Sequence, residues 1–464
     1  MKEMLEKTVE YALKLGADYA DIRVEKVATR EITACKGIIE KAVSGVDSGA
    51  AMRVLVNGAW GYASTSSITL ESLKESFERA VKMARVNSEK LPEHERIKLA
   101  DVKNVEDTVR IKVRKSLNAM DISEKISFIL EVDKVIRDHS PKIVSTDIRY
   151  GDMVGKKILL TSEGTFIVMD VSRAYISMTA IAKEGARIQS YRTRIGGKGG
   201  FEKIERGDPV SEAKRAASKA VEMLKAKPAP SGRFTVIADP LHIGVFAHEA
   251  LGHACEADLV TSGQSIVAGK LGEQIGSEVV TIYDDSTVDF WGSEKYDDEG
   301  VPTRKRVLIE NGILKEYITN RESAAKLGVE PNGGGRAMNY NYAPIVRMSN
   351  TYVAPGDYSF EELIEDIKYG IYVKDSRGGQ VDPAMGTFQF NAQEAYLIEK
   401  GEITTPLLDV SLSGLTLETL KNIDAVGKDL KLSIGFCGKG GQYVPVGTGG
   451  PHVRIKEVVV GGMR

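Results

Sequence analysis

Cysteine is scarce in this sequence: Cys35, Cys255 and Cys437 are the only cysteines in 464 residues. Three widely separated cysteines form no disulfide framework, which excludes the small disulfide-rich secreted class and fits a reducing compartment. Long apolar runs are missing too, since no window approaches the ~18 consecutive apolar residues that cross a bilayer. The opening stretch, Met1 to Lys7, alternates in charge and lacks the apolar core of a secretory signal. We therefore expect a cytoplasmic protein with no membrane contact.

The sequence also lacks an excess of either charge. It holds 63 lysines and arginines against 65 aspartates and glutamates, a net charge of -2. Such a balance gives no bulk attraction to nucleic acid or to an anionic membrane, so we expect no direct nucleic-acid partner. The apolar content of 42% and charged content of 28% are ordinary for a soluble globular protein.

The length of the chain predicts more than one domain, because 464 residues exceed what a single hydrophobic core usually supports. We predict an N-terminal α+β domain at 1–86, a charged connector at 87–117, a central α+β domain at 118–226 and a C-terminal domain at 227–464. The predicted fold class is α+β, with sandwich-like N-terminal and central domains built on antiparallel sheets. The C-terminal domain is predicted to be β-rich and to contain a helix that begins after Asp239.

Short alternating runs predict separate strands in the first two domains, and helical periodicity predicts helices beside them. A glycine cluster at 196–200 has neither the spacing nor the strand-to-helix context of a phosphate-binding loop, so we interpret it as a flexible loop. The predicted strands are 18–27, 31–34, 38–44, 49–56, 58–63, 143–150, 156–161, 165–169 and 172–181, and the helices are 3–15, 69–84, 121–138 and 208–224.

The most informative stretch runs from Asp239 to Asp258. An apolar, β-branched strand at 233–238 precedes it, and Asp239-Pro240 supplies an N-cap followed by proline at the first helical position. The helix that begins there carries His248-Glu249 and, five residues after the first histidine, His253. The zinc-peptidase signature H-E-x-x-H has one residue fewer between its histidines.

The longer spacing has a geometric consequence. At 3.6 residues per turn, side chains four residues apart differ by roughly 40° around the helix, whereas side chains five apart differ by roughly 140°. A regular helix would therefore point His248 and His253 away from each other. Gly252 accepts a distorted backbone, so we predict a one-turn π-bulge or a break between Glu249 and His253.

Two histidines do not complete a catalytic zinc site, which generally has three protein ligands and an open position. Cys437 is the best third candidate, because glycines around it leave its sulfur unobstructed. A soft thiolate beside two imidazoles favours zinc over magnesium or calcium. Cys255, on the same element as His253, could compete for this role. His242 is interpreted as a packing or capping residue, with a supporting role behind the ligands as the alternative.

Several segments together resemble the TldD/PmbA family of metallopeptidases. They are H-E-A-L-G-H at 248–253, the tail C-G-K-G-G-Q-Y-V-P-V-G at 437–447, and the runs at 342–352, 378–382 and 394–401. The resemblance implies one Zn²⁺ per catalytic subunit, held by His248, His253 and Cys437, with Glu249 as general base. It also implies a dimer that cleaves short or unfolded peptides in an internal cavity.

The family contains two kinds of subunit. TldD-like subunits carry the H-E-x-x-x-H motif and the late cysteine, whereas TldE/PmbA-like partners lack both, so this chain resembles the TldD-like kind. Whether its partner is an identical copy or a TldE/PmbA-like chain stays open. His452 matches no family histidine and receives no role. Four polar residues in the matching runs could orient peptide or ligands, or equally bond sheets to loops: Arg347, Asn350, Asp382 and Asn391.

Three functions are compatible with these residues. The first is a zinc-dependent metallopeptidase in which metal-activated water hydrolyses the amide with Glu249 as base. The second is a non-catalytic regulatory or adaptor subunit with a structural metal site. The third is a zinc amidohydrolase acting on a non-peptide amide. A fourth protein ligand from Cys255, His452 or an aspartate would favour the structural site, because structural zinc sites are closed.

Overall fold

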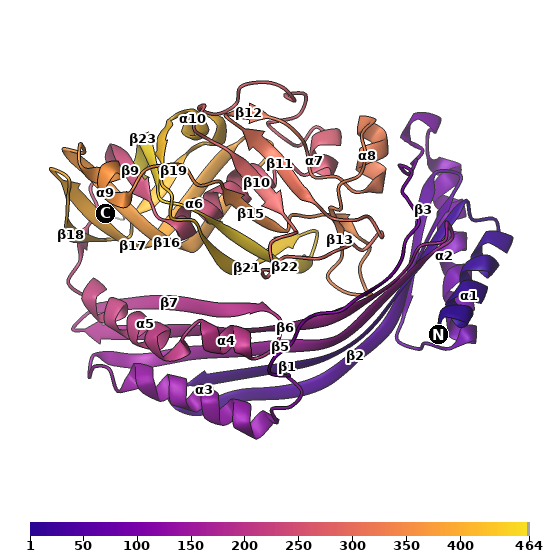
Figure 1. The fold of residues 1–464 in the computed structure, drawn as a ribbon, viewed down its shortest axis with the longest axis horizontal. Coiled ribbons are helices and arrows are strands. Elements are labelled where there is room, and N and C mark those ends of the chain that lie inside the picture. The colour runs from indigo at the N-terminus through magenta and orange to yellow at the C-terminus, as the bar shows by residue number, and fades with distance from the viewer. Residues whose placement is uncertain (462–464) are drawn as a thin grey trace.

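The computed structural model describes residues 1–461 and shows two stacked layers (Figure 1). One layer is a long curved sheet from the first half of the chain, with helices on its outer face. The other is a β-rich body from the second half, which lies against the inner face of that sheet. No helix within residues 1–461 has the length and apolarity required to span a membrane.

The curved sheet draws strands from both of the first two predicted domains. Its order is β3-β2-β1-β5-β6-β4, with β7 beside β6. Strand β1 pairs antiparallel with β5 from Asp21↔Thr161 to Ala34↔Ile148, so one sheet runs through both regions. The strands are β1 (Tyr19–Cys35), β2 (Ile38–Val56), β3 (Ala59–Thr65), β4 (Glu106–Val109), β5 (Ile143–Thr161), β6 (Phe166–Glu184) and β7 (Arg187–Lys198).

Two helical groups cover this sheet over two separate apolar cores. One core includes Leu5 and Phe77 at one end, and the other includes Ile129 and Ala216 at the opposite end. The helices are α1 (Lys2–Lys14), α2 (Leu70–Lys90), the 3₁₀ turn η1 (Glu93–Glu95), α3 (Ile122–Arg137), α4 (Glu202–Arg206) and α5 (Pro209–Met223).

The long strands differ from the predicted short ones. The sequence predicts breaks within β1, β2, β5 and β6, but each is continuous. Residues 40–47 of β2 are exposed on both faces, so buried and exposed residues do not alternate there, although the hydrogen-bonded pairing with β1 continues.

The loop prediction is also wrong for Gly196 and Gly197, which lie in β7. A Cβ on Gly196 would lie 2.7 Å from Ile434 Cδ1, so this strand needs glycine where the C-terminal layer approaches it.

The C-terminal layer contains two large sheets and one small sheet. The eight-stranded sheet has the order β16-β9-β23-β19-β17-β18-β8 with β20 beside β23, and the six-stranded sheet has the order β12-β11-β10-β15-β22-β21. The eight-stranded sheet contains β8 (Lys227–Pro228), β9 (Gly232–Ala238), β16 (Tyr369–Asp382), β17 (Thr387–Glu399), β18 (Glu402–Leu408), β19 (Ser411–Leu415), β20 (Ile423–Val426) and β23 (Val453–Gly461). The six-stranded sheet contains β10 (Ile282–Asp285), β11 (Lys305–Glu310), β12 (Ile313–Leu314), β15 (Asn350–Val353), β21 (Lys431–Lys439) and β22 (Gln442–Gly450). The small sheet pairs β13 (Gly335–Arg336) with β14 (Ile345–Val346).

The predicted metal helix lies among these strands. It consists of α6 (Pro240–Phe246) and the π-helical turn η2 (Ala247–Gly252), and it buries Ile243, Phe246 and Leu251 in the largest core. Gly244 packs directly against β22, because a Cβ there would lie 2.3 Å from Gly449 N. The α+β class and the β-rich C-terminal layer are as predicted. The remaining helices are α7 (Ala257–Thr261), α8 (Arg321–Leu327), α9 (Phe360–Ile364) and α10 (Thr416–Lys421).

Buried ion pairs join the two layers. Arg173 of β6 and Lys198 of β7 contact Glu294 at 2.5 and 2.9 Å. Arg53 of β2 contacts Glu299 at 2.7 Å. Each pair fixes the C-terminal layer against the curved sheet.

Candidate metal centre

The helix that carries the histidines begins as the sequence predicts. The Asp239 carboxylate accepts hydrogen bonds from the main-chain N–H groups of Leu241 and His242 at 3.1 and 2.8 Å, and Pro240 takes the first helical position. These contacts satisfy helix N–H groups that otherwise have no partner. His248 is therefore on an anchored element and not on a mobile loop.

The predicted π-bulge is present. Residues 247–252 form a π-helical turn, and His253 N donates to His248 O at 3.1 Å across the five-residue spacing. The extra residue is absorbed here, so both imidazoles lie on the same side of the helix, with ring centroids 5.3 Å apart.

Gly252 is needed for close packing. A Cβ at this position would lie 2.1 Å from Met348 Sδ and 3.3 Å from Ala247 O, and its φ is outside the left-handed region. From the sequence, we expect Gly252 to be needed because glycine accepts a distorted backbone. In the structure it is needed because the π turn packs directly against Met348, with no space for a side chain.

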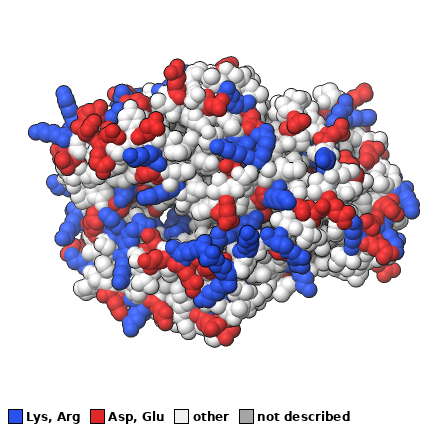
Figure 2. Space-filling model, viewed as in Figure 1, with Lys and Arg blue, Asp and Glu red and all other residues white. Residues whose placement is uncertain are grey.

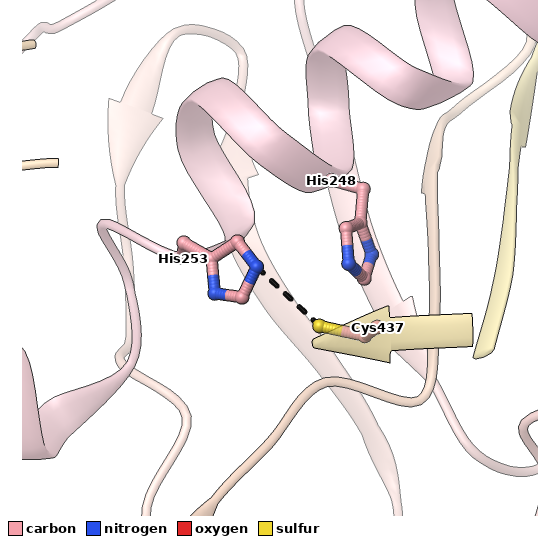
Figure 3. A group of neighbouring side chains, drawn as sticks. All are labelled: His248, His253 and Cys437. Atoms are coloured by element: carbon pink, nitrogen blue, oxygen red, sulfur yellow. Dashed lines mark hydrogen bonds between the residues drawn. The ribbon is translucent and has the colours of Figure 1, made fainter. Parts of the chain in front are cut away.

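The third predicted ligand joins the two histidines. Cys437, on β21, places its Sγ 3.4 Å from His253 Nε2, and one donor atom of each of the three residues lies within 4.8 Å of the others (Figure 3). Their exposed fractions are 2% for His248, 8% for His253 and 2% for Cys437. No other group of three or more His, Cys, Asp or Glu residues converges in this way within residues 1–461.

The two imidazoles have different surroundings. His253 Nδ1 is 2.8 Å from Glu256 Oε2, which leaves Nε2 facing Cys437. Both ring nitrogens of His248 are buried, and neither has a hydrogen-bond partner within residues 1–461. An unbonded buried nitrogen costs free energy unless another group binds it, so His248 is suited to a ligand that the protein does not supply.

The charges of the cluster reinforce one another. Burial acts to raise the pKa of the Cys437 thiol, but the neighbouring imidazoles of His248 and His253 outweigh it and lower the pKa to about 5. Burial acts to lower the pKa of His253, but the carboxylate of Glu256 and the sulfur of Cys437 raise it well above its usual value. The thiolate, which is the metal-binding form of cysteine, is thus favoured at neutral pH.

Glu249 borders the cluster without joining it. Its side chain is 39% exposed, and its Oε2 lies 3.7 Å from His253 Nε2. It is absent from the converging donor atoms. This arrangement leaves the carboxylate beside the cluster and in contact with solvent.

The other cysteine and histidine candidates lie elsewhere. Cys255 is fully buried and does not join the group, and burial raises the pKa of its thiol far above the usual value. His452 bonds to Asp429 Oδ2 at 2.7 Å and to the Tyr372 hydroxyl at 2.8 Å. His242 Nδ1 bonds to the main-chain oxygen of Asp375 at 2.8 Å, which fits its predicted packing role.

Of the four polar residues in the family-like runs, one supports the cluster. Arg347 is fully buried and donates to the main-chain oxygens of Cys437 and Gln442, so it fixes the tip of the β21–β22 hairpin. The other three do not contact the cluster. Asn350 forms hydrogen bonds with main-chain atoms of Gly292 and Asp285, and Asp382 accepts hydrogen bonds from the main-chain N–H groups of Ala384 and Met385 in a turn. Asn391 is exposed on β17.

Sequence reasoning missed Glu256, which contacts His253 from behind, and Lys439, which contacts Glu256. Lys439 Nζ lies 3.0 Å from Glu256 Oε2, and the Glu256 side chain is fully buried. Their spacing carries a signal, since Glu256 follows His253 by three residues and Lys439 follows Cys437 by two on one strand. That spacing puts each residue near its ligand but does not show that the two meet.

The donor set fits zinc. Imidazole nitrogen and thiolate sulfur are its common ligands, and in a tetrahedral site with bonds of ~2.0–2.3 Å neighbouring donors lie about 3.5 Å apart. The 3.4 Å between Cys437 Sγ and His253 Nε2 matches that separation. One ring nitrogen of His248 would supply the third donor atom.

Family models match nearly the whole chain. They are described as PmbA/TldA metallopeptidase domain 1 over residues 20–84, the central domain over 115–224 and the C-terminal domain over 231–462. The chain belongs to the TldD/PmbA family.

Relatives of this TldD/PmbA member carry protease names. A metalloprotease of Methanocaldococcus jannaschii is 47% identical over 456 residues, covering 98% of this chain and 99% of the relative. A zinc metalloprotease TldD homolog of Saccharolobus solfataricus is 36% identical, covering 98% and 99%.

Solved structures share the TldD/PmbA fold. A Thermotoga maritima protein named as a modulator of a DNA gyrase has a TM-score of 0.82 at 25% identity, covering 99% of this chain and 100% of the other. TldE from Thermococcus kodakarensis has a TM-score of 0.80 at 23% identity, covering 99% and 100%. Because TldE is only 23% identical to this chain, its similarity shows a shared fold and nothing more.

Proposed function

We propose that this chain is a zinc-dependent metallopeptidase that hydrolyses short or unfolded peptides. The observation that carries the proposal is the convergence of His248, His253 and Cys437 donor atoms within 4.8 Å, beside a partly exposed Glu249. The protease names of the relatives support the same class of reaction.

In this proposal His248, His253 and Cys437 hold one Zn²⁺. When bound, zinc supplies Lewis acidity, which acidifies water and polarises the scissile carbonyl. Glu249 accepts the proton of the attacking water and passes it to the leaving amine, because its carboxylate is exposed next to the ligands. Glu256 and the packed π turn hold His253 in place during both steps.

The number of donors favours catalysis over a structural site. A structural zinc generally has four protein ligands, and the donor group found in residues 1–461 contains three, without Cys255 or His452. A regulatory or adaptor subunit with a closed metal site is therefore the weaker alternative. An amidohydrolase acting on a non-peptide amide would use the same centre and differs only in its substrate.

The proposed partners follow the family. We propose a dimer, formed with a second copy or with a TldE/PmbA-like chain, in the cytoplasm. A direct role on DNA has no electrostatic support here, because the net charge is -2 and basic and acidic side chains are interspersed on the face in Figure 2.

The test is a peptidase assay with zinc-loaded wild type and Glu249→Gln, using casein and fluorogenic peptides. The variant should keep bound zinc and lose turnover by about 10²–10⁴-fold, the usual contribution of a general base. Glu273→Gln is a matched control, because Glu273 is exposed and pairs with the partly exposed Lys270. Equal rates for wild type and Glu249→Gln would reject Glu249 as the base.

A further inference from the structure

We propose that Glu256 and Lys439 are positioning residues that hold His253 and Cys437 together and thereby set the affinity for zinc. This inference rests on the proposed metal site but adds a second pair of residues to it. Neither residue touches substrate, and neither belongs to the converging donor group.

Glu256 fixes the orientation of one imidazole. Its Oε2 lies 2.8 Å from His253 Nδ1, so the proton on Nδ1 is donated to Glu256 and Nε2 is left to face Cys437. A carboxylate behind a metal-binding histidine selects the tautomer and raises its basicity. In the described part of the chain, His248 has no such partner on either nitrogen. Glu256 therefore acts on one of the two histidines only.

The main chain at Glu256 is itself anchored. Ala257 N donates to Ile318 O at 2.9 Å, and Ile318 N donates to Cys255 O at 2.8 Å. Glu256 lies between these two bonds and is fully buried. Burial and the contact with Lys439 restrict the movement of its carboxylate, so the carboxylate helps to hold His253 in position.

Lys439 connects that carboxylate to the strand of the third ligand. Its Nζ lies 3.0 Å from Glu256 Oε2, 2.7 and 2.8 Å from the two oxygens of Asp258, and 3.0 Å from Val346 O. Lys439 and Cys437 are two residues apart on β21, so their side chains share one face of the strand. One ammonium group thus ties the strand of Cys437 to the segment that follows the π turn.

The link is expected to matter because the ligands come from distant parts of the chain. A preformed site avoids ordering the strand and the helix when the metal binds, and the saving appears as affinity. Replacing Lys439 would also leave the buried Glu256 with one cationic neighbour fewer, and an uncompensated buried charge is costly. Both effects loosen the His253–Cys437 pair.

A variant at Asp258 distinguishes two possible roles of these charges: positioning of His253, and neutralisation of the Lys439 charge. The Asp258 oxygens lie 2.7 and 2.8 Å from Lys439 Nζ, closer than the 3.0 Å of Glu256 Oε2, but no bond joins Asp258 to either His253 or Cys437. Its side chain is 37% exposed, whereas that of Glu256 is fully buried. Substituting Asp258 therefore perturbs the lysine without removing the partner of His253.

The experiment measures zinc dissociation constants of full-length protein by competition with a chromophoric chelator. The constant should rise about 10–100-fold in Glu256→Ala and in Lys439→Met, the usual effect of removing a partner behind a ligand. Glu256→Gln keeps an acceptor oxygen and should recover part of the loss. Asp258→Ala should stay near wild type. Thermal unfolding of the metal-free proteins shows whether each variant folds.

Cobalt spectra give a readout independent of activity. Co²⁺-loaded Glu256→Gln should keep the thiolate charge-transfer band of Cys437 while its ligand-field bands shift, because only the imidazole is disturbed. Wild-type affinity in Glu256→Ala, Glu256→Gln and Lys439→Met would overturn the inference, as would an equal loss in Asp258→Ala. Wild type that binds no zinc overturns both proposals, whereas a fully active Glu249→Gln removes only the proposed function.

Discussion

Cys437 Sγ lies 3.4 Å from His253 Nε2, although 184 positions separate them in the sequence. The pairing of β21 with β22, where Cys437 faces Val444, and of β22 with β15 brings the sulfur there. Closing so long a segment costs conformational entropy, which the packing of the C-terminal layer must offset. The metal centre therefore depends on the complete C-terminal fold.

Cys437→Ala should lose bound zinc, because it removes the only sulfur of the donor group. Cys255→Ala should keep its zinc, since Cys255 is outside that group. Metal content after dialysis, measured by atomic emission, compares the two variants. A full zinc complement in Cys437→Ala would show that the sulfur is not a ligand.

Gly252→Ala should lower both stability and zinc content. The new Cβ would lie 2.1 Å from Met348 Sδ, and overpacking of this kind costs about 1–3 kcal/mol. Alanine has the better helix propensity by about 1 kcal/mol, so a net loss identifies the clash as dominant.

Two further variants test this explanation. Gly45→Ala is the control, because no neighbouring atom of residues 1–461 lies within 4 Å of a Cβ at Gly45. Adding Met348→Ala to Gly252→Ala should restore part of the zinc content in the double variant. Unfolding curves that match wild type for Gly252→Ala would contradict the packing role.

Glu294→Gln should destabilise the protein at neutral pH by about 3 kcal/mol, because Arg173 and Lys198 lose their shared carboxylate. Burial acts to raise the pKa of Glu294, but Arg173 and Lys198 outweigh it and hold the pKa well below the usual 4.5. A depressed carboxyl pKa stabilises the fold above the unfolded-state value, and the contribution is lost as pH falls toward the folded-state value.

The difference in stability between wild type and Glu294→Gln should therefore shrink below about pH 4.5. Chemical denaturation of both proteins across the acid range measures it. Glu418→Gln serves as control, since Glu418 forms an exposed pair with Arg233 at 3.5 Å. A difference that stays constant or widens at acid pH would contradict the assigned linkage.

The sequence predicted the structural features that depend on residues close together in the chain. The five-residue spacing of His248 and His253 predicted the π turn, and Asp239-Pro240 predicted the helix start. Each depends on residues close together in the chain. The place of Cys437 came from a resemblance and from its glycine neighbours, because no local pattern carries a contact across 184 positions.

The sequence could not show which distant surfaces meet. Gly196 looked like part of a loop because its requirement for glycine comes from Ile434 in the other layer. The exposed part of β2 looked like a break because neither of its faces is buried. Glu256 and Lys439 looked like ordinary charged residues, since their contact exists only after β21 packs beside the π turn.

The most direct test of the central claim is X-ray absorption at the zinc edge of the purified protein. We expect one sulfur at about 2.3 Å, two imidazole nitrogens at about 2.0 Å and one further light ligand from solvent. The sulfur signal should vanish in Cys437→Ala. A zinc shell without sulfur, or one closed by a fourth protein ligand in wild type, would contradict the proposed catalytic centre.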